Sequence, residues 1–599
     1  MRQLFFFLLT FPLALKAQFY EDYIGAGHAE GVTVTSSDEF QLFGQSFTAS
    51  GANTINGQGM DARFMEVVRF MNQASLGADQ SIIQEVMGMG FEAWLDAQAD
   101  TEPSFLHPRM ISIIDEAIAN YIAQGGDPEN YFSPGPWHFQ YAWWQINMTN
   151  EDLLRQRVAY ALSQILVTSY NSNLSDRADG IAYYYDVLVE HALGNYQDLL
   201  MDVSLHPAMG LYLSHFNNPR NNDALNIHPD ENYAREVMQL FSIGLYELNL
   251  DGTQVLDGTG NPIPTYGLDE VKELAEVFTG LGPGAMVPNP FDNTPNFGDG
   301  FYFTDFGVPM AMYEAWHEPG QKNLVNEGIV PAGQTGIEDI EDAIEILFTH
   351  PNVGPFIATR LIQHMVKSNP TPAYVQRVAE IFNDNGNGVR GDLHATVKAI
   401  LLDDEARDCE WISEPFHGKL TEPFCRYTQF SRMSDVLAEE ERYWNAGYAF
   451  LESTEQAPMN SKSVFNFFQP TYQPNGPIAD AGLVAPEFQI HNSLSSIAYM
   501  NEVNDWTFWW ALMYSWEEAI EPVFVDISDL EDLARSPEVL INELDKLYLR
   551  GQMSDGLREI LRTSLDGLQG STVGPTYLSY RARMAQYLVL ISPDYAVLR

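Results

Sequence analysis

Apolar residues recur every three to four positions in one segment after another from residue 62 onward, which restricts the chain to helices that bury one face. A helix with one apolar stripe must cover that stripe with another element. We therefore expect a mainly α, large multi-helix single domain over residues 61–599. No unit repeats, so a solenoid is not expected. The clearest helical patterns lie at residues 62–77, 80–99, 151–169, 183–206, 269–281, 340–350, 354–368, 372–386 and 393–403.

Three stretches interrupt this pattern. Asp-Gly and Gly-Asn turn signals between short runs predict one short β-hairpin at residues 249–266. Residues 281–335 are rich in Gly, Pro and Asn, and residues 465–489 are rich in Pro and aromatic residues. We expect both to be long loops, and loops of this length in compact proteins are often functional.

The N-terminus differs from the rest of the chain. Residues 1–17 place one Arg before an apolar run, as a secretory signal peptide does, so we expect an exported, periplasmic or extracellular protein. No later segment is long and apolar enough to span a bilayer. Residues 18–60 are rich in Gly, Ser and Thr and predict an extended arm, with strand-like alternation at residues 31–37.

Acidic residues outnumber basic ones by 81 to 31, for a formal net charge of −50. Such a charge argues against nucleic acid or anionic lipid as the main partner. The two cysteines, Cys409 and Cys425, cannot form a zinc site alone. In an oxidising compartment they could form one disulfide, and two buried thiols are the alternative.

The stretch from His206 to Leu245 carries the most unusual polar pattern. Each helical residue advances about 100°, so Asn232, Glu236 and Gln239 form a polar stripe bordered by Arg235 on an otherwise apolar helix at residues 228–239. Such a stripe either faces water or lines a buried hydrogen-bonded site.

Two interpretations of this stretch remain open. His206, His228 and Glu231 are residue types that bind a divalent metal, and a carboxylate such as Glu236 can act as a general base toward bound water. In the other interpretation, a polar network that includes Asn232, Gln239 and Asn217 holds the Asn-rich loop in place. No tight metal-binding spacing such as HExxH occurs.

Three further motifs each have a functional and a structural interpretation. His317 and Glu318, with Lys322 nearby, could complete a site on the 228–239 helix or could anchor a loop. Residues 383–394 resemble an EF-hand loop, but His394 stands where a bidentate Glu is needed, so a turn is favoured. Aromatic residues could stack on a ligand, although core packing is favoured; they are Phe465, Phe467, Phe468, Tyr472, Tyr443, Trp444 and Tyr448.

A series of ordered motifs resembles the bacterial exported family catalogued as domain of unknown function 1800. The motifs are LRQRVAYALSQILVTS, PDENYAREVMQLFSIGLYELNLDGT, WHEPGQK, FIATRLIQHMVKSNPTPAYVQRVAEIFNDNGNGVRGDL, KLTEPFCR, SVFNFFQPTYQPNG, APEFQI and YLVLISPDYAV. The resemblance spans residue 60 to the C-terminus. It implies an exported protein without an assigned reaction, and it implies an exported sulfatase-like protein as a partner.

Two functions are therefore expected as alternatives. One is a hydrolase-like enzyme that uses Glu236, Arg235 and His317 as catalytic residues, with a divalent metal as a possible cofactor. The other is a non-catalytic binding or scaffold protein that acts with the sulfatase-like partner. The sequence holds no GxSxG, P-loop, dinucleotide-binding or haem-attachment signature that would favour another enzyme class.

Overall fold

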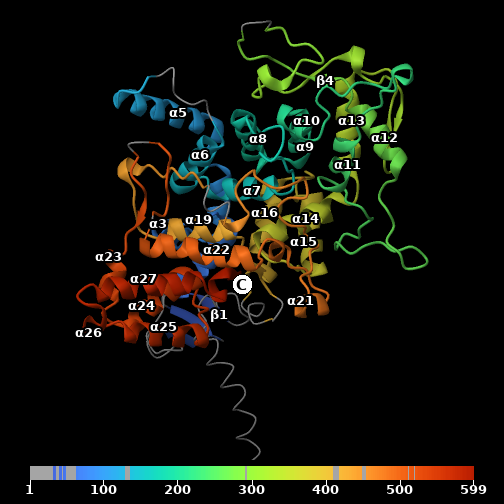
Figure 1. The fold of residues 1–599 in the computed structure, drawn as a ribbon. Coiled ribbons are helices and arrows are strands. Elements are labelled where there is room, and N and C mark those ends of the chain that lie inside the picture. Colours follow the sequence, from blue (N-terminus) through green and yellow to red (C-terminus); the bar gives the residue numbers. More distant parts are fainter. Residues whose placement is uncertain are drawn as a thin grey trace, which may run out of the picture.

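The computed structural model describes residues 32–34, 39–42, 45–48, 62–127, 135–289, 293–408, 414, 417–447, 453–509, 511–517 and 520–599. Helices dominate this part of the chain (Figure 1), which confirms the mainly α-helical prediction. The predicted signal peptide lies outside the described residues, as does most of the predicted arm. No helix in the described ranges combines the length and the apolar character that a bilayer crossing requires.

Many helices begin where the sequence supplies a cap. Thr335 and Glu338 form a capping box at the start of α13, Thr371 caps α15 ahead of a proline in its first turn, and Asp392 caps α16. These groups satisfy backbone N–H groups that have no partner within a helix. The first half of the chain forms α2 (Ala62–Ala74), α3 (Gln80–Met89), α4 (Phe91–Ala99), α5 (Leu106–Ala123), α6 (Pro136–Thr149), α7 (Leu153–Ser163), α8 (Ala178–His191), α9 (Tyr196–Leu205), α10 (Pro207–Tyr212), α11 (Asn232–Gln239) and α12 (Leu268–Val277).

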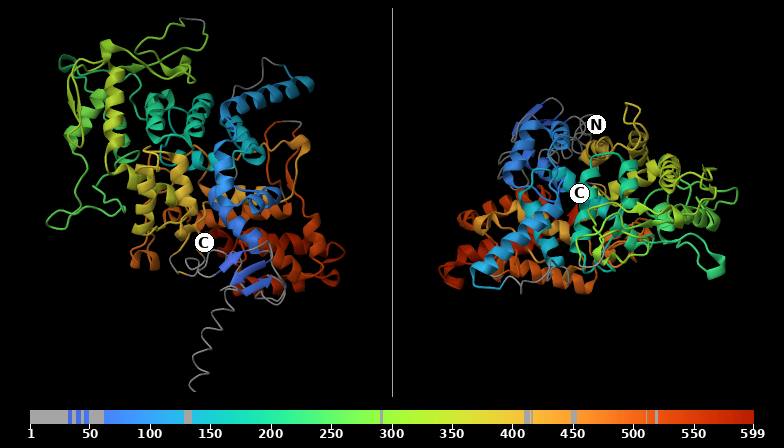
Figure 2. Two further views of the ribbon diagram at one scale, coloured as in Figure 1. Left: turned by 180° about the vertical axis from the view of Figure 1, so that it is seen from behind. Right: turned by 90° about the horizontal axis from the view of Figure 1, so that it is seen from above.

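The second half of the chain is also mainly helical. Helices α24, α25 and α27 pack together at one end of the molecule, and α8 to α13 lie at the opposite end (Figures 1 and 2). The remaining helices are α13 (Gly336–Thr349), α14 (Val353–Met365), α15 (Pro372–Asn383), α16 (Leu393–Leu402), α17 (Asp404–Arg407), α19 (Pro423–Met433), α21 (Pro477–Asp480), α22 (Ser493–Asn504), α23 (Ser528–Leu533), α24 (Pro537–Leu544), α25 (Asp555–Gly567), α26 (Gly570–Val573), α27 (Tyr577–Leu590) and α28 (Pro593–Ala596).

A layer of aromatic side chains joins α6 to α19 in the core. The ring centroids of Trp143 and Phe424 are 4.7 Å apart, and those of Trp144 and Tyr427 are also 4.7 Å apart. Tyr160 of α7 stacks on Phe424 at 5.6 Å. Large buried rings of this kind dominate core energetics, and offset or edge contacts add to their burial. The layer therefore fixes α6, α7 and α19 relative to one another.

Short strand pairs are more numerous than the single hairpin that the sequence predicts. At residues 245–265, three short segments each pair with the other two through isolated bridges, which agrees with a hairpin-like structure there. The region 281–335, predicted to be a loop, contains two antiparallel pairs, because backbone pairing needs no apolar alternation over so few residues. The strands are β1 (Val32–Val34), β2 (Glu39–Leu42), β3 (Gln45–Thr48), β4 (Leu281–Gly282), β5 (Ala311–Met312), β6 (Lys322–Asn323), β7 (Ile329–Val330), β8 (Lys419–Leu420), β9 (Val436–Leu437), β10 (Phe524–Val525) and β11 (Val597–Leu598).

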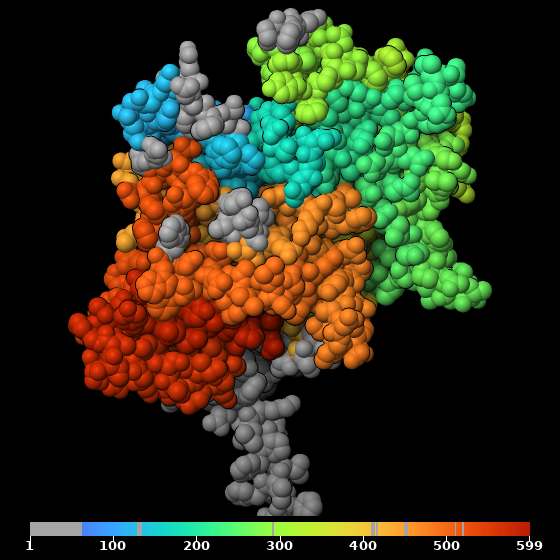
Figure 3. Space-filling view, viewed as in Figure 1, coloured from blue at the N-terminus to red at the C-terminus, as the bar shows by residue number. Residues whose placement is uncertain are grey.

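The end of the chain returns to the middle of the molecule. Strand β11 pairs antiparallel with β8, so that Leu598 lies opposite Lys419. Residues 460–500, orange in Figure 3, cross the visible face between the helices of the first half and the C-terminal helices. Segments from the beginning, middle and end of the sequence therefore meet around β8.

Candidate functional site

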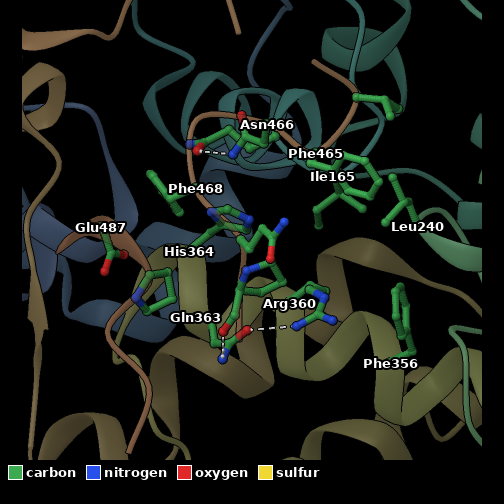
Figure 4. Close-up of a pocket in the computed structure, with 15 residues that line it drawn as sticks. Ile165, Leu240, Phe356, Arg360, Gln363, His364, Phe465, Asn466, Phe468 and Glu487 are labelled. Atoms are coloured by element: carbon green, nitrogen blue, oxygen red, sulfur yellow. Dashed lines mark hydrogen bonds between the residues drawn. The ribbon is translucent and has the colours of Figure 1, made fainter. Parts of the chain in front are cut away.

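A cavity lies where α14, the end of α7 and the segment 464–470 meet. Its volume is about 600 Å³ when the space open to solvent is included. Ile165, Leu240 and Phe356 contribute apolar wall, and Phe465 is 44% exposed at its edge. Figure 4 shows polar side chains among these apolar ones, including His364 and Arg360 of α14. Mostly apolar walls with a few polar groups are typical of small-molecule sites.

A buried ion cluster lies behind this cavity. The Lys419 Nζ is 3.0 Å from a carboxylate oxygen of Glu487 and 4.0 Å from one of Glu422. Lys419 also donates to the backbone carbonyls of Gln363 at 3.0 Å and His364 at 2.8 Å. All three charged side chains are at most 5% exposed. Two acids therefore share one buried lysine, and the lysine ties β8 to the end of α14.

Glu422 is the most heavily hydrogen-bonded carboxylate of the cluster. It accepts from the Tyr160 hydroxyl at 3.0 Å, from the Gln164 amide at 3.2 Å and from the Gln456 amide. Asn466, which lines the cavity, donates to the Gln164 carbonyl oxygen at 3.0 Å. Glu422 also stands just before Pro423 at the start of α19, where the helix dipole favours a negative charge. A hydrogen-bonded path thus connects the cavity wall to the ion cluster.

Three polar atoms at or near the cavity have no hydrogen-bond partner among the residues that the structure describes. Two are the His364 Nδ1 and the Glu487 Oε2. The third is a terminal nitrogen of Arg157, which donates through its other terminal nitrogen to the His364 carbonyl. His364 and Glu487 line the cavity directly. Buried polar atoms are normally paired, so unpaired ones beside an open cavity indicate a place for a ligand's polar groups.

Arg360 faces the cavity and forms no ion pair with a carboxylate of the described residues. Its guanidinium donates to Gln363 at 3.0 Å and lies 4.9 Å from the Phe356 ring centroid. Within the described ranges no acidic group lies within ion-pair distance of it. Burial lowers the pKa of Arg360 to about 10, so it remains charged at neutral pH. The guanidinium can therefore pair with an anion from outside the chain.

Burial also shifts the pKa values of the other titratable groups here. It lowers the pKa of His364 well below its ordinary value, with Lys419 and Arg157 adding to the effect. It raises the pKa of Glu487, although Lys419 opposes that shift. Burial raises the pKa of the Cys425 thiol to about 12, which argues against thiolate chemistry. Cys409, the other half of the predicted disulfide, lies outside the described residues.

The histidines of the His206–Leu245 stretch are dispersed. His206 is 6% exposed and its Nδ1 accepts from the Ala208 N–H at 3.1 Å, capping α10. His215 is fully buried, stacks on Tyr233 at 4.0 Å and donates to the Ser204 carbonyl. The exposed His228 contacts Asn221 at 2.9 Å. Glu231, the third predicted metal ligand, pairs with Arg235 at 3.0 Å. The described residues contain no group of three His, Cys, Asp or Glu side chains that could hold a metal ion, and His206, His228 and Glu231 are accordingly not gathered into one.

The polar stripe of α11 also has separate partners. Glu236 is 6% exposed, its Oε2 has no hydrogen-bond partner among the described residues, and burial raises its pKa. Gln239 accepts from the Tyr266 hydroxyl at 3.4 Å, whereas the exposed Asn232 bonds through its backbone to Asp230. Asn217 donates to the Asp299 carbonyl at 2.9 Å. The predicted network of Asn232, Gln239 and Asn217 is therefore not formed, because each residue bonds to a different neighbouring segment.

His317 belongs to a different cluster from Glu236 and Arg235. Its Nε2 lies 2.9 Å from Asp339 of α13, and its Nδ1 lies 3.0 Å from the Thr279 carbonyl. Lys322 of β6 contacts the same Asp339 oxygen. His317 is 2% exposed, and no hydrogen bond or ion pair joins it to Glu236 or Arg235. This geometry corresponds to the loop-anchoring interpretation.

The EF-hand-like segment at residues 383–394 forms a turn, and the aromatic residues named above are partly in the core. The oxygens of Asp384 and Asn385 accept backbone N–H groups of residues 386–389, which forms a turn between α15 and α16. Trp444 and Phe468 are buried, whereas Phe465 is exposed at the cavity. Tyr448 lies outside the described residues.

The buried histidines predict how stability depends on pH. Burial lowers the pKa of His206 to about 3, below its ordinary value of 6.5, so the unfolded chain binds a proton more readily. The His206 contribution to stability is complete above pH 6.5 and is lost as the pH falls toward 3, by about 1.4 kcal/mol per pH unit. His206→Asn keeps a side chain that can cap α10 but does not titrate. Urea unfolding at a series of pH values should therefore show that the free energy of unfolding of this variant changes less steeply with pH than that of the wild type. Equal slopes for the two proteins would contradict the prediction.

The cavity residues escaped prediction from the sequence. Arg157, Arg360, His364, Lys419, Glu422 and Glu487 carry the site, yet none belongs to a recognised catalytic spacing. A usable signal was present: charged residues stand inside mostly apolar helices or beside Pro in the motifs quoted above. Six of those motifs, from LRQRVAYALSQILVTS to APEFQI, supply residues to this one region.

Comparison with known proteins identifies the family of the chain. A family model described as "Protein of unknown function (DUF1800)" matches residues 69–597. No curated protein matches, and no solved structure matches. The matched range contains every residue of the cavity and of the ion cluster. The chain therefore belongs to the DUF1800 family of proteins of unknown function.

Proposed function

We propose that this protein binds a small anionic molecule with an apolar body in the cavity beside α14. The observation that carries the proposal is Arg360, a guanidinium without a carboxylate partner in the described ranges, at the wall of a cavity of about 600 Å³ including the space open to solvent. In a chain with a net charge of −50, cations are scarce and acids abundant. Glu487 also lines the cavity but pairs with Lys419, whereas Arg360 has no ion-pair partner among the described residues, which favours an anionic ligand beside Arg360.

The remaining groups support a ligand with defined polar positions. The Nδ1 of His364 and the Oε2 of Glu487 line the same cavity and have no partner among the described residues, so a ligand hydroxyl or amide N–H can donate to them. Phe356 and Phe465 offer flat apolar surface for the ligand body. A low pKa keeps His364 neutral, which suits a hydrogen-bonding role better than that of a base.

This proposal favours a binding function over the hydrolase-like alternative. Glu236, Arg235 and His317 occupy separate surroundings, which does not favour one catalytic centre made from them. Export and a sulfatase-like partner stay predictions from the sequence and from the family resemblance. A ligand site at α14 is compatible with either.

A pair of fluorescent probes tests the proposal. Anilinonaphthalene sulfonate carries an anionic group on an aromatic body, and phenylnaphthylamine is a similar uncharged body. Hydrogen bonds to charged groups contribute about 1.5–3 kcal/mol, so Arg360→Gln should weaken the sulfonate roughly 10- to 100-fold. Binding of the uncharged probe should change less than about twofold.

Arg235→Gln is the matched control, because it removes an arginine outside the cavity whose side chain is 41% exposed. It should leave both titrations unchanged. The proposal fails if neither probe binds with saturation, or if Arg360→Gln and Arg235→Gln weaken the sulfonate equally.

A further inference from the structure

A second cavity lies at the C-terminal end of α19, beside α23 and α27, and several acidic side chains line it. Its volume is about 970 Å³ including the space open to solvent. Five carboxyl groups line it, and they come from three stretches of the chain: Asp435, Asp526, Asp529, Asp532 and Glu543. Elements distant in sequence thus direct negative charge toward one space.

Only part of this charge is compensated. Asp532 pairs with Arg535 at 3.4 Å and Glu543 with Lys546 at 2.8 Å. In the described part of the chain, no basic side chain lies within ion-pair distance of Asp435, Asp526 or Asp529. The pKa of Asp435 is raised by its partial burial and by the nearby charges of Asp529 and Asp526. An added positive charge would relieve this repulsion.

An independent observation comes from Gln586 of α27. This side chain is 1% exposed and lines the same cavity. Its side chain hydrogen-bonds with Tyr548, but its carbonyl oxygen has no partner in the part of the chain that the structure describes. A buried carbonyl oxygen without a donor is costly, and a ligand N–H would satisfy it.

The floor of the cavity decides between kinds of cation. Leu530, Leu533 and Leu547 line it beside the acids and offer apolar surface there. The described acids include no group of three placed closely enough to hold a metal ion. Methylene groups gain from contact with leucine, whereas a hydrated metal ion does not.

We propose that this cavity binds a small organic cation with several amine groups, whose nitrogens pair with Asp435, Asp526 and Asp529 and donate to Gln586. The methylene segments between the nitrogens lie against the three leucines. The site is separate from the cavity at Arg360, and its occupancy does not depend on the anion proposed there.

Calorimetric titration of the full chain with spermidine tests this inference. We expect saturable binding with one spermidine per chain, weakened at least tenfold by Asp435→Asn with Asp529→Asn. The charge-matched control is Glu341→Gln with Glu345→Gln, which removes two exposed acids from α13 and should change the affinity less than twofold. Gln586→Met keeps the side-chain size without the carbonyl oxygen and should weaken binding severalfold at an unchanged melting temperature.

Three results would overturn the inference: the absence of saturable binding, an equal loss in the two double variants, or wild-type affinity in Gln586→Met. A parallel titration with Ca²⁺ separates the cation classes, because Ca²⁺ binding as tight as that of spermidine would reject an organic cation. The Arg360→Gln variant should bind spermidine with wild-type affinity. The spermidine titration therefore tests this inference even if the anion proposal fails.

Discussion

Replacing Lys419 by methionine is expected to lower the free energy of unfolding by about 3–5 kcal/mol. The substitution leaves Glu422 and Glu487, each 1% exposed, without their shared cation, and it removes the lysine hydrogen bond to the Gln363 carbonyl of α14. An uncompensated buried charge costs more than the ion pair itself contributes. Urea unfolding followed by circular dichroism measures the loss.

Two further variants make this prediction specific. Lys419→Met combined with Glu422→Gln and Glu487→Gln removes all three charges and should recover at least half of the loss, since neutral groups can be buried at less cost. Lys462→Met removes a lysine whose side chain is 74% exposed and paired with Glu455, and should cost less than about 1 kcal/mol. A similar loss in Lys462→Met and Lys419→Met would contradict the interpretation of the cluster.

The second large effect is expected at the cluster that holds His317. Lys322 is fully buried and contacts Asp339, the Glu318 carbonyl and His317. Lys322→Met should therefore lower the free energy of unfolding by about 3–5 kcal/mol, because Asp339, 1% exposed, would keep its charge without a cation. Thermal and urea unfolding provide the measurement.

Asp339→Asn in the Lys322→Met background separates a structural role from a catalytic one. We call the buried cluster of His317, Lys322 and Asp339 the clasp. If the clasp is structural, removing the Asp339 charge as well should restore part of the free energy of unfolding. The double variant should also bind the sulfonate probe as the wild type does, because the clasp is not part of the cavity at Arg360. If Lys322→Met unfolds at the same urea concentration as the wild type, the buried clasp is not what holds residues 317–322 to α13.

The sequence predicted the elements better than their assembly. Apolar spacing and caps such as Thr335 and Asp392 act within one turn of backbone, so the helices at residues 340–350 and 393–403 could be located locally. The turn at residues 384–391 was predictable for the same reason, since its oxygens bond within five residues. The strand pairs inside residues 281–335 escaped notice because two-residue strands carry no periodic signal.

The candidate site, in contrast, could not be located from the local sequence. Histidines and acids crowded between His206 and Glu236 suggested one site, yet backbone paths send His206 into a helix cap and His228 to the surface. Lys419 and Glu487 are 68 residues apart by their sequence numbers, yet their side chains meet at 3.0 Å. No local pattern encodes that meeting.

From the sequence by itself, the helical class, the caps, the acidic character and the family resemblance could be determined, because each depends on composition or on neighbours a few residues apart. Only the tertiary structure decided which charged side chains are buried together and which face a cavity. The physical reason is that burial and ion pairing arise from packing between distant segments, here around β8, where residues 419 and 598 pair. Only the tertiary structure shows that Arg360 has no carboxylate partner, and that the Gln586 carbonyl oxygen has no hydrogen-bond donor, among the described residues.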